Sequence, residues 1–181
     1  MHAWVELELP EGQTARLYAG QIIGRTSAAA LRLDLPEVSE AHALVSLRGE
    51  RLWLLALRRR FQVRQAAQDA APLSAGLAIE LVPGFEVRVA AVHLPADVLG
   101  LEGPGLPPQA LLGTCGLVFD PHPRLVAGTP PQAGAHFWAT GGQWRARVAG
   151  QLHTLEAGAP LEVGGQTFQA VNVPLGHAGN A

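Results

Sequence analysis

Apolar and polar residues alternate with a period of two along much of this sequence, and this alternation constrains the fold more than any other feature. Phe85, Val87 and Val89, for example, are separated by Glu86 and Arg88. Successive side chains of a β-strand point to opposite faces of a sheet, so the pattern predicts strands with one buried face. The same alternation occurs in residues 3–9 and 14–19, and short apolar runs typical of buried sandwich strands occur at 52–57 and 77–82. Turn signals separate these segments and no amphipathic helical stripe is found, so the sequence predicts an all-β sandwich.

Composition narrows the class of protein. The 181 residues are 48% hydrophobic and 15% charged, with a formal net charge of −2. A chain this apolar can bury enough surface to fold, and its charge is unlike that of proteins that bind the backbone of nucleic acids. No apolar run is long enough to cross a bilayer, the N-terminus does not resemble a signal peptide, and the single cysteine cannot form an internal disulfide. We therefore expect a cytoplasmic protein that binds neither nucleic acid nor membrane. The chain has 13 arginines and no lysine, a usage that suggests a GC-rich bacterial genome.

The chain is long enough for two small domains, and its proline content suggests where they meet. Four prolines lie within residues 94–108, which we expect to form a connector. The predicted organisation is an N-terminal domain at residues 1–93, this connector, a diverged β-rich domain at residues 109–177 and a tail at residues 178–181.

A faint internal repeat supports two related domains. His42 followed by Trp53 matches His136 followed by Trp144, Leu73–Gly76 matches Leu155–Gly158, and Phe85 matches Phe168. The offset between the copies falls from 94 residues at the histidines to 83 at the phenylalanines, so the second copy is expected to be shorter between these points. No counterpart of the opening strands is recognisable in the second copy.

The most specific local pattern is a Gly-Arg pair, Gly24-Arg25, followed by Ser39-x-x-His42 and then by an apolar strand segment. In this order and spacing, the residues resemble the early signature of the forkhead-associated (FHA) family. The Leu73–Gly76 segment also resembles the step that precedes the last two strands in that family. The resemblance covers residues 1–93 and implies a β-sandwich whose loops at one end bind phosphothreonine in partner proteins.

The resemblance also implies a role for each motif residue. Arg25 would pair with the phosphate, since a guanidinium offers a rigid planar fork of donors, and Ser39 would supply a hydroxyl donor. His42 would brace the loop without touching the ligand. Gly24 would allow a backbone conformation or a close approach that a Cβ would block.

One family residue is missing. The FHA family carries an Asn-Gly pair after the middle strands, whose Asn fixes the peptide backbone, but this chain has no Asn before Asn172. The corresponding stretch, residues 57–64, contains the run Arg58–Arg60 instead. Either these arginines supply replacement donors for an anionic segment, or the site has lost its ligand and the run is a solvated loop. The acidic Glu40, next to Ser39, opposes an incoming phosphate.

The second copy lacks the phosphate-binding residues. Aligned by its sequence, it has Gly113-Thr114 at the position of Gly24-Arg25 and Ala133 at the position of Ser39. Without the guanidinium and the hydroxyl there is no phosphate cradle. We therefore expect a degenerate copy that serves packing or protein contact.

No pattern in the sequence indicates catalysis or a cofactor. Cys115 has apolar neighbours and is expected to be a buried, unreactive thiol. The spacing of His122, His136 and His153 does not fit a metal site. There is no nucleophile elbow, phosphate-binding loop or paired-carboxylate pattern. We therefore expect neither an enzyme nor a bound metal or cofactor.

The sequence thus predicts a non-enzymatic protein-interaction module, active in signalling, whose partner is a phosphorylated threonine segment. The alternative is a phosphate-independent structural or assembly scaffold that keeps the same fold and self-associates through sheet edges or exposed aromatic residues. Trp138 fits such an exposed contact position, whereas Trp53 and Trp144 fit the core or a half-buried platform.

Overall fold

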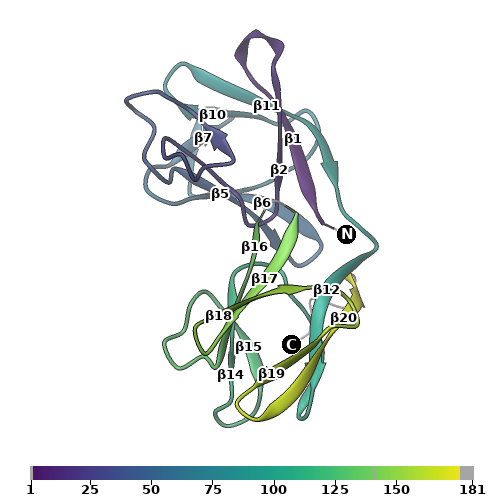
Figure 1. Cartoon of the computed structure of the whole chain (residues 1–181). Coiled ribbons are helices and arrows are strands. Elements are labelled where there is room, and N and C mark those ends of the chain that lie inside the picture. Colours follow the sequence, from purple (N-terminus) through teal and green to yellow (C-terminus); the bar gives the residue numbers. More distant parts are fainter. Residues whose placement is uncertain (1, 141, 176–181) are drawn as a thin grey trace. The chain divides into compact units, whose positions relative to one another are not determined.

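The computed structural model describes residues 2–140 and 142–175, and nearly all of its regular structure is β-strand. The predicted all-β fold is therefore confirmed. The chain divides into two compact units (Figure 1): the first unit is Ala3–Leu94, and the second unit begins at Pro95 and includes His2. The predicted tail at residues 178–181 lies outside the described residues. No helix in the described part of the chain is long and apolar enough to span a membrane.

Two sheets pack as a sandwich in the first unit. The elements are β1 (Trp4–Glu8), η1 (Pro10–Gly12), β2 (Thr14–Tyr18), β3 (Ile22–Gly24), β4 (Leu31–Arg32), β5 (Ala43–Arg48), β6 (Arg51–Ala56), β7 (Phe61–Val63), β8 (Ala66–Gln68), β9 (Ala70–Pro72), β10 (Ala78–Val82) and β11 (Phe85–His93). One sheet has the order β2-β1-β11-β10-β7-β8, and the other has the order β4-β3-β5-β6-β9. β3 and β4 run parallel, and the other neighbours run antiparallel. The apolar alternate residues face a shared core, which contains Val5, Ile23, Val45, Leu54, Phe61 and Val87.

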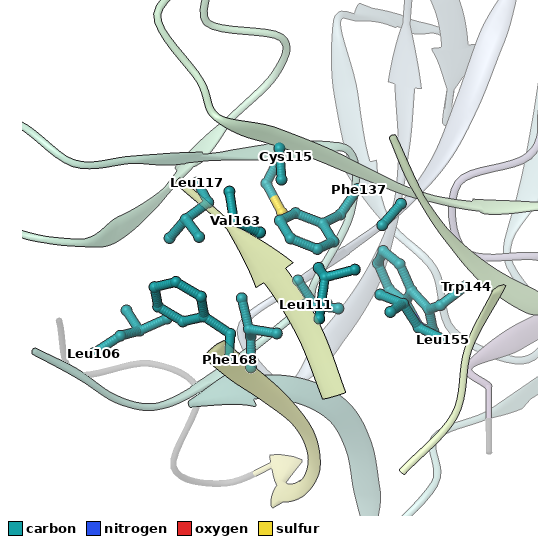
Figure 2. Close-up of a cluster of buried hydrophobic side chains, with 13 residues drawn as sticks. Leu106, Leu111, Cys115, Leu117, Phe137, Trp144, Leu155, Val163 and Phe168 are labelled. Atoms are coloured by element: carbon teal, nitrogen blue, oxygen red, sulfur yellow. The ribbon is translucent and has the colours of Figure 1, made fainter. Parts of the chain in front are cut away.

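The second unit is a smaller sandwich. Its strands are β12 (Asp97–Gly103), β13 (Leu106–Ala110), β14 (Cys115–Val118), β15 (Arg124–Ala127), β16 (Ala135–Thr140), β17 (Gln143–Val148), β18 (Gln151–Leu155), β19 (Pro160–Val163) and β20 (Gln166–Pro174). The two sheets have the orders β13-β12-β20-β19 and β15-β14-β16-β17-β18. Figure 2 shows the apolar cluster between them, in which Phe137 and Phe168 are fully buried.

The predicted connector at residues 94–108 is wrong, because this segment contains β12 and the start of β13. Pro107 and Pro108 lie inside β13, which is an edge strand of its sheet. Proline lacks the N–H that a central strand needs, but it is tolerated at a sheet edge. Several prolines close together therefore indicated a linker where the chain forms an edge strand.

The second unit repeats the strand order of the first. The sheet β13-β12-β20-β19 corresponds to β2-β1-β11-β10, and the sheet β15-β14-β16-β17-β18 corresponds to β4-β3-β5-β6-β9. Individual bonds correspond as well, since the Gly76 N–H donates to the Val89 carbonyl and the Gly158 N–H donates to the Ala170 carbonyl. β12 and β13 are thus the counterparts of the opening strands, which the sequence comparison did not recognise.

The hairpin β7–β8 has no counterpart among the described residues of the second unit. In the first unit, residues 57–69 separate β6 from β9, whereas β17 and β18 are joined by a tight turn after Val148. The offset between equivalent residues accordingly falls from 92 at Ala43 and Ala135 to 82 at Gly76 and Gly158. The shorter second copy is therefore explained by the absence of this one insertion.

The residue-by-residue correspondence differs from the one predicted. The His42 N–H donates to the Ile23 carbonyl at 2.9 Å, and the Gly134 N–H donates to the Leu117 carbonyl at 2.9 Å, each just before the central strand of its sheet. The counterpart of His42 is therefore Gly134 and not His136. His136 lies two residues further along, on the half-buried outer face of β16.

The same register preserves the match of Leu73–Gly76 with Leu155–Gly158 but moves other proposed matches, and it pairs Phe168 with Val87 and not with Phe85. Val118-Phe119, rather than Gly113-Thr114, corresponds to Gly24-Arg25, because Leu117 and Ile23 occupy equivalent positions opposite the first residue of β16 and β5. Trp144 corresponds to Leu52 and not to Trp53, since both follow the first residue of their strand after the hairpin turn. The sequence comparison matched residue types, whereas strand register preserves the buried face and not the residue identity.

Candidate functional site

Three connections of the first unit meet at one end of the sandwich through backbone hydrogen bonds. The Arg25 N–H donates to the Ser39 carbonyl at 3.0 Å, which joins the loop after β3 to the loop before β5. The Leu57 N–H donates to the His42 carbonyl at 3.0 Å, which joins the loop after β6 to the start of β5. Arg25, Ser39 and the arginine run that begins at Arg58 are therefore held at the same end of the unit.

Gly24 permits the close approach of two of these connections. A Cβ built on Gly24 would overlap the Glu40 carbonyl oxygen and lie 2.9 Å from its carbonyl carbon. Backbone atoms cannot yield to a side chain as the end of a flexible side chain can. Any other residue at position 24 would thus push β3 away from the loop that carries Ser39.

His42 links this loop to the opposite sheet and is 1% exposed. Its Nδ1 accepts the Ser39 N–H at 3.2 Å, and its Nε2 lies 2.9 Å from the Leu81 carbonyl of β10. Because Nδ1 is an acceptor, the ring carries its proton on Nε2 and donates it to Leu81. The imidazole is buried and fully used in these two bonds, so its place in the structure is that of a brace.

Arg25 is exposed, and none of the described residues places a carboxylate in an ion pair with it. The ion pairs of the described chain are Arg16–Glu6 and Arg60–Asp69. The half-buried Ser39 is adjacent through the backbone, and the exposed Glu40 follows it. The guanidinium is therefore available to an external anion, beside a residue that carries a hydroxyl.

The three arginines after β6 differ in their surroundings. Arg58 and Arg59 are exposed and form no ion pair within the described residues. Arg60 donates from Nε to Asp69 Oδ1 at 2.9 Å, and the two side chains are 65% and 69% exposed. An ion pair this exposed contributes little to stability, but it engages the Arg60 guanidinium. Arg58 and Arg59 are thus the better candidates for a ligand at this end.

The half-buried Phe119 stands at the corresponding end of the second unit. Its ring meets Phe168 edge-on, with 5.9 Å between the ring centroids. A Cβ built on Gly134 would lie 2.8 Å from the Phe119 ring and 3.0 Å from Val163, so the ring lies close beside the position that corresponds to His42. An aromatic ring packed inward thus stands where the first unit has an exposed guanidinium.

The sequence predicted Gly24, Arg25, Ser39 and His42 as one group, and the structure brings these residues together. It missed Asp69, because the contact with Arg60 exists only when the hairpin β7–β8 folds the chain back between them. It also missed Phe119, because the repeat was aligned on His136.

Comparison with known proteins relates the N-terminal half of the chain to solved structures. No protein-family model matches the chain, and no curated protein matches it. The FhaA FHA domain complexed with the intracellular domain of Rv3910 is 30% identical, with a TM-score of 0.43, over 47% of this chain and 98% of that chain. A structure from an analysis of phosphothreonine-dependent FHA domain interactions is 29% identical, with a TM-score of 0.45, over 50% of this chain and 99% of that chain. Mycobacterium tuberculosis EmbR in complex with a low-affinity phosphopeptide is 24% identical, with a TM-score of 0.43, over 51% of this chain and 26% of that chain.

The contacts of the motif residues agree with the resemblance to the FHA family that the sequence shows. Gly24 allows the close approach, His42 forms the buried brace, and Arg25 and Ser39 are joined by a backbone bond. The first unit of this chain is thus similar to FHA domains.

Proposed function

We propose that this protein is a non-enzymatic interaction module whose first unit binds a phosphothreonine segment of a partner protein at the loops that carry Arg25 and Ser39. The observation that supports this best is the exposed Arg25 guanidinium, which has no carboxylate partner among the described residues. Solved relatives of the first unit include FHA domains with phosphothreonine-dependent interactions. The proposal assigns the same class of ligand to this chain.

Each residue has a separate task in this proposal. A phosphothreonine carries a charge of about −1.5 to −2 at neutral pH and accepts several hydrogen bonds. Arg25 pairs with two phosphate oxygens through its planar fork, and the Ser39 hydroxyl donates a further bond. His42 keeps the Ser39 loop in place from inside the sandwich.

Arg58 and Arg59 take over the task of the missing asparagine. They are exposed at the same end of the unit, and each offers donors to the backbone carbonyls or acidic side chains of a bound segment. They also offset the negative charge of the exposed Glu40, which stands beside Ser39. Arg60 contributes less, because it donates to Asp69.

The test is a fluorescence anisotropy titration with labelled phosphothreonine peptides and their unphosphorylated twins. We expect the phosphorylated peptide to bind more tightly, and we expect Arg25→Ala to weaken that binding by about thirtyfold, the effect of losing a charge-assisted bidentate contact worth roughly 2 kcal/mol. Arg48→Ala is the matched control. Arg48 is also exposed, but it lies at the far end of β5 from His42, so its loss should leave binding unchanged.

Equal binding of the two twins, or full binding by the Arg25→Ala variant, would refute phosphate recognition. The phosphate-independent scaffold would then be favoured. Light scattering at several concentrations would show it as self-association that phosphopeptides do not affect.

A further inference from the structure

We infer that the second unit binds an extended acidic segment of a partner protein, which adds as a strand to the free edge of β18. This inference does not rest on the phosphothreonine site, which lies in the other unit. β18 is the last strand of its five-stranded sheet, so one row of its backbone N–H and C=O groups has no partner in that sheet. Such a row is a template for another extended chain.

β18 lacks the residues that usually protect a sheet edge. The other edges of the second unit carry prolines in β13, a proline and a glutamate in β19, and an arginine at the start of β15. β18 has the sequence Gln-Leu-His-Thr-Leu, without proline, Asp, Glu or Arg. Its Leu152 is 58% exposed, more than Leu57 at 42% or Leu94 at 38%. An unprotected edge with an exposed leucine of this kind indicates an interaction surface.

The equivalent edge of the first unit is blocked by proline. Leu73 donates its N–H inward to the Leu52 carbonyl at 2.8 Å, so the preceding residue, Pro72, turns its backbone outward. Pro72 offers no outward donor there. Thr154 occupies the same position in β18 and retains its N–H, and by the same alternation Leu152 also presents its backbone outward.

Two arginines lie beside these residues on the same face of the sheet. Leu152 is opposite Arg147 and Thr154 is opposite Arg145, whose Nη1 donates to the Thr154 hydroxyl at 2.7 Å. The Arg147 guanidinium lies 5.8 Å from the centroid of the Trp138 ring. Tryptophan and arginine are the side chains most often responsible for binding energy at interfaces. Alternate side chains of an added strand would lie next to this group.

The charge of the sheet selects an acidic occupant. None of the five strands β14, β15, β16, β17 and β18 contains Asp or Glu, and neither Arg145 nor Arg147 forms an ion pair within the described residues. Carboxylates on the added strand would neutralise these arginines. A second copy of this chain suits the edge less well, because pairing two β18 strands would bring four arginines to the same face.

The test uses the full chain and two labelled ten-residue probes, one of alternating Glu and Val and one of alternating Lys and Val. We expect fluorescence anisotropy to show at least tenfold tighter binding of the Glu probe. Thr154→Pro, which copies Pro72, should weaken that binding about tenfold through loss of one backbone bond and of strand geometry. Arg147→Glu should reverse the preference between the probes. The Glu probe should also slow hydrogen exchange in β18.

Arg25→Ala is the control that distinguishes binding at the first unit from binding at β18, and it should leave binding of the Glu probe unchanged. Circular dichroism would test whether Thr154→Pro is folded. The Arg147→Glu variant gives a second, independent result that does not depend on this check. Equal binding of the two probes, or normal binding by Arg147→Glu, would overturn the inference. So would a dimer that Thr154→Pro dissociates, because the occupant of the edge would then be a second copy.

Discussion

The two units of this chain share one strand order, yet the corresponding ends of their sandwiches have opposite characters. In the first unit, His42 bonds to Leu81 in the opposite sheet and Arg25 is exposed. In the second unit, Gly134 replaces the histidine, and Phe119 replaces the arginine and lies beside the glycine, with its ring edge-on to Phe168. An aromatic ring thus stands in the second unit where the first unit has an exposed guanidinium, and it lies beside a glycine instead of a buried imidazole. The shared strand order places equivalent loops at equivalent ends, and the residues at these two positions give the ends different chemistry.

The equivalent sheet edges, β9 in the first unit and β18 in the second, also differ. The first unit blocks β9 with Pro72 and extends its other sheet with the hairpin β7–β8. The second unit has no such hairpin among its described residues and leaves β18 without proline or charge. The candidate site of the first unit thus lies on its loops, whereas the second unit has an unprotected strand edge beside a face that carries two arginines. The following predictions test this contrast, from the largest expected effect to the smallest.

Gly24→Ala should have the largest effect. The new Cβ would overlap the Glu40 carbonyl, so the first unit should lose about 3 kcal/mol in its free energy of unfolding, and the variant should lose phosphopeptide binding as well. Urea denaturation measures the first quantity. Gly113→Ala is the control, because a Cβ at Gly113 meets no atom within 4 Å. Equal effects of the two substitutions would restore the sequence-based match of Gly113 with Gly24.

Phe119→Ala should destabilise the second unit by about 2 kcal/mol, because the ring packs against Phe168 and the buried apolar cluster around it. Its counterpart, Arg25→Ala, should change the free energy of unfolding by less than about 0.5 kcal/mol, because the side chain is exposed. Thermal or urea unfolding of both variants measures the contrast. If the two variants lost similar amounts of unfolding free energy, the Phe119 ring would not contribute to the packing of the second unit as described here.

The buried thiol of Cys115 should make the stability of the second unit depend on pH. Burial raises the pKa of this thiol to about 12 from 9.0. The folded chain therefore keeps the proton above pH 9 while the unfolded chain loses it, so stability should fall as the pH rises beyond 9, by at most about 1.4 kcal/mol per pH unit. Comparing unfolding at pH 8 and pH 10 with that of Cys115→Ala isolates this contribution. An identical pH dependence in the variant would contradict it.

The turn of the hairpin β7–β8 should give the smallest effect. Arg64 and Gln65 have φ angles of 52° and 63°, a left-handed conformation that Asn-Gly adopts with less strain. Replacing the pair by Asn-Gly should raise the free energy of unfolding by about 0.5–1 kcal/mol without weakening peptide binding. A loss of stability would mean that these side chains make contacts that outweigh the strain.

Sequence patterns predicted the class of fold and the motif residues, because both depend on local order along the chain. The alternation of apolar and polar residues predicts strands, and the motif from Gly24 to His42 identifies two loops that lie side by side in the structure. The relation between the units was harder to predict, because strand register preserves the buried face, so that His136 misled the alignment. The prolines near residue 107 indicated a linker, but they lie in an edge strand, which tolerates proline. Contacts such as Arg60 with Asp69 depend on the folded hairpin and have no local signal.

The central claim is that the chain has one phosphate-binding end, in the first unit, and that Arg25 forms it. The most direct measurement is ³¹P nuclear magnetic resonance of a bound phosphothreonine peptide, titrated against the wild type and the Arg25→Ala and Phe119→Ala variants. The account predicts a shifted phosphorus resonance that saturates at one peptide per chain, is unchanged in Phe119→Ala and is lost in Arg25→Ala. A second saturating site, or a shift that survives in Arg25→Ala, would contradict it.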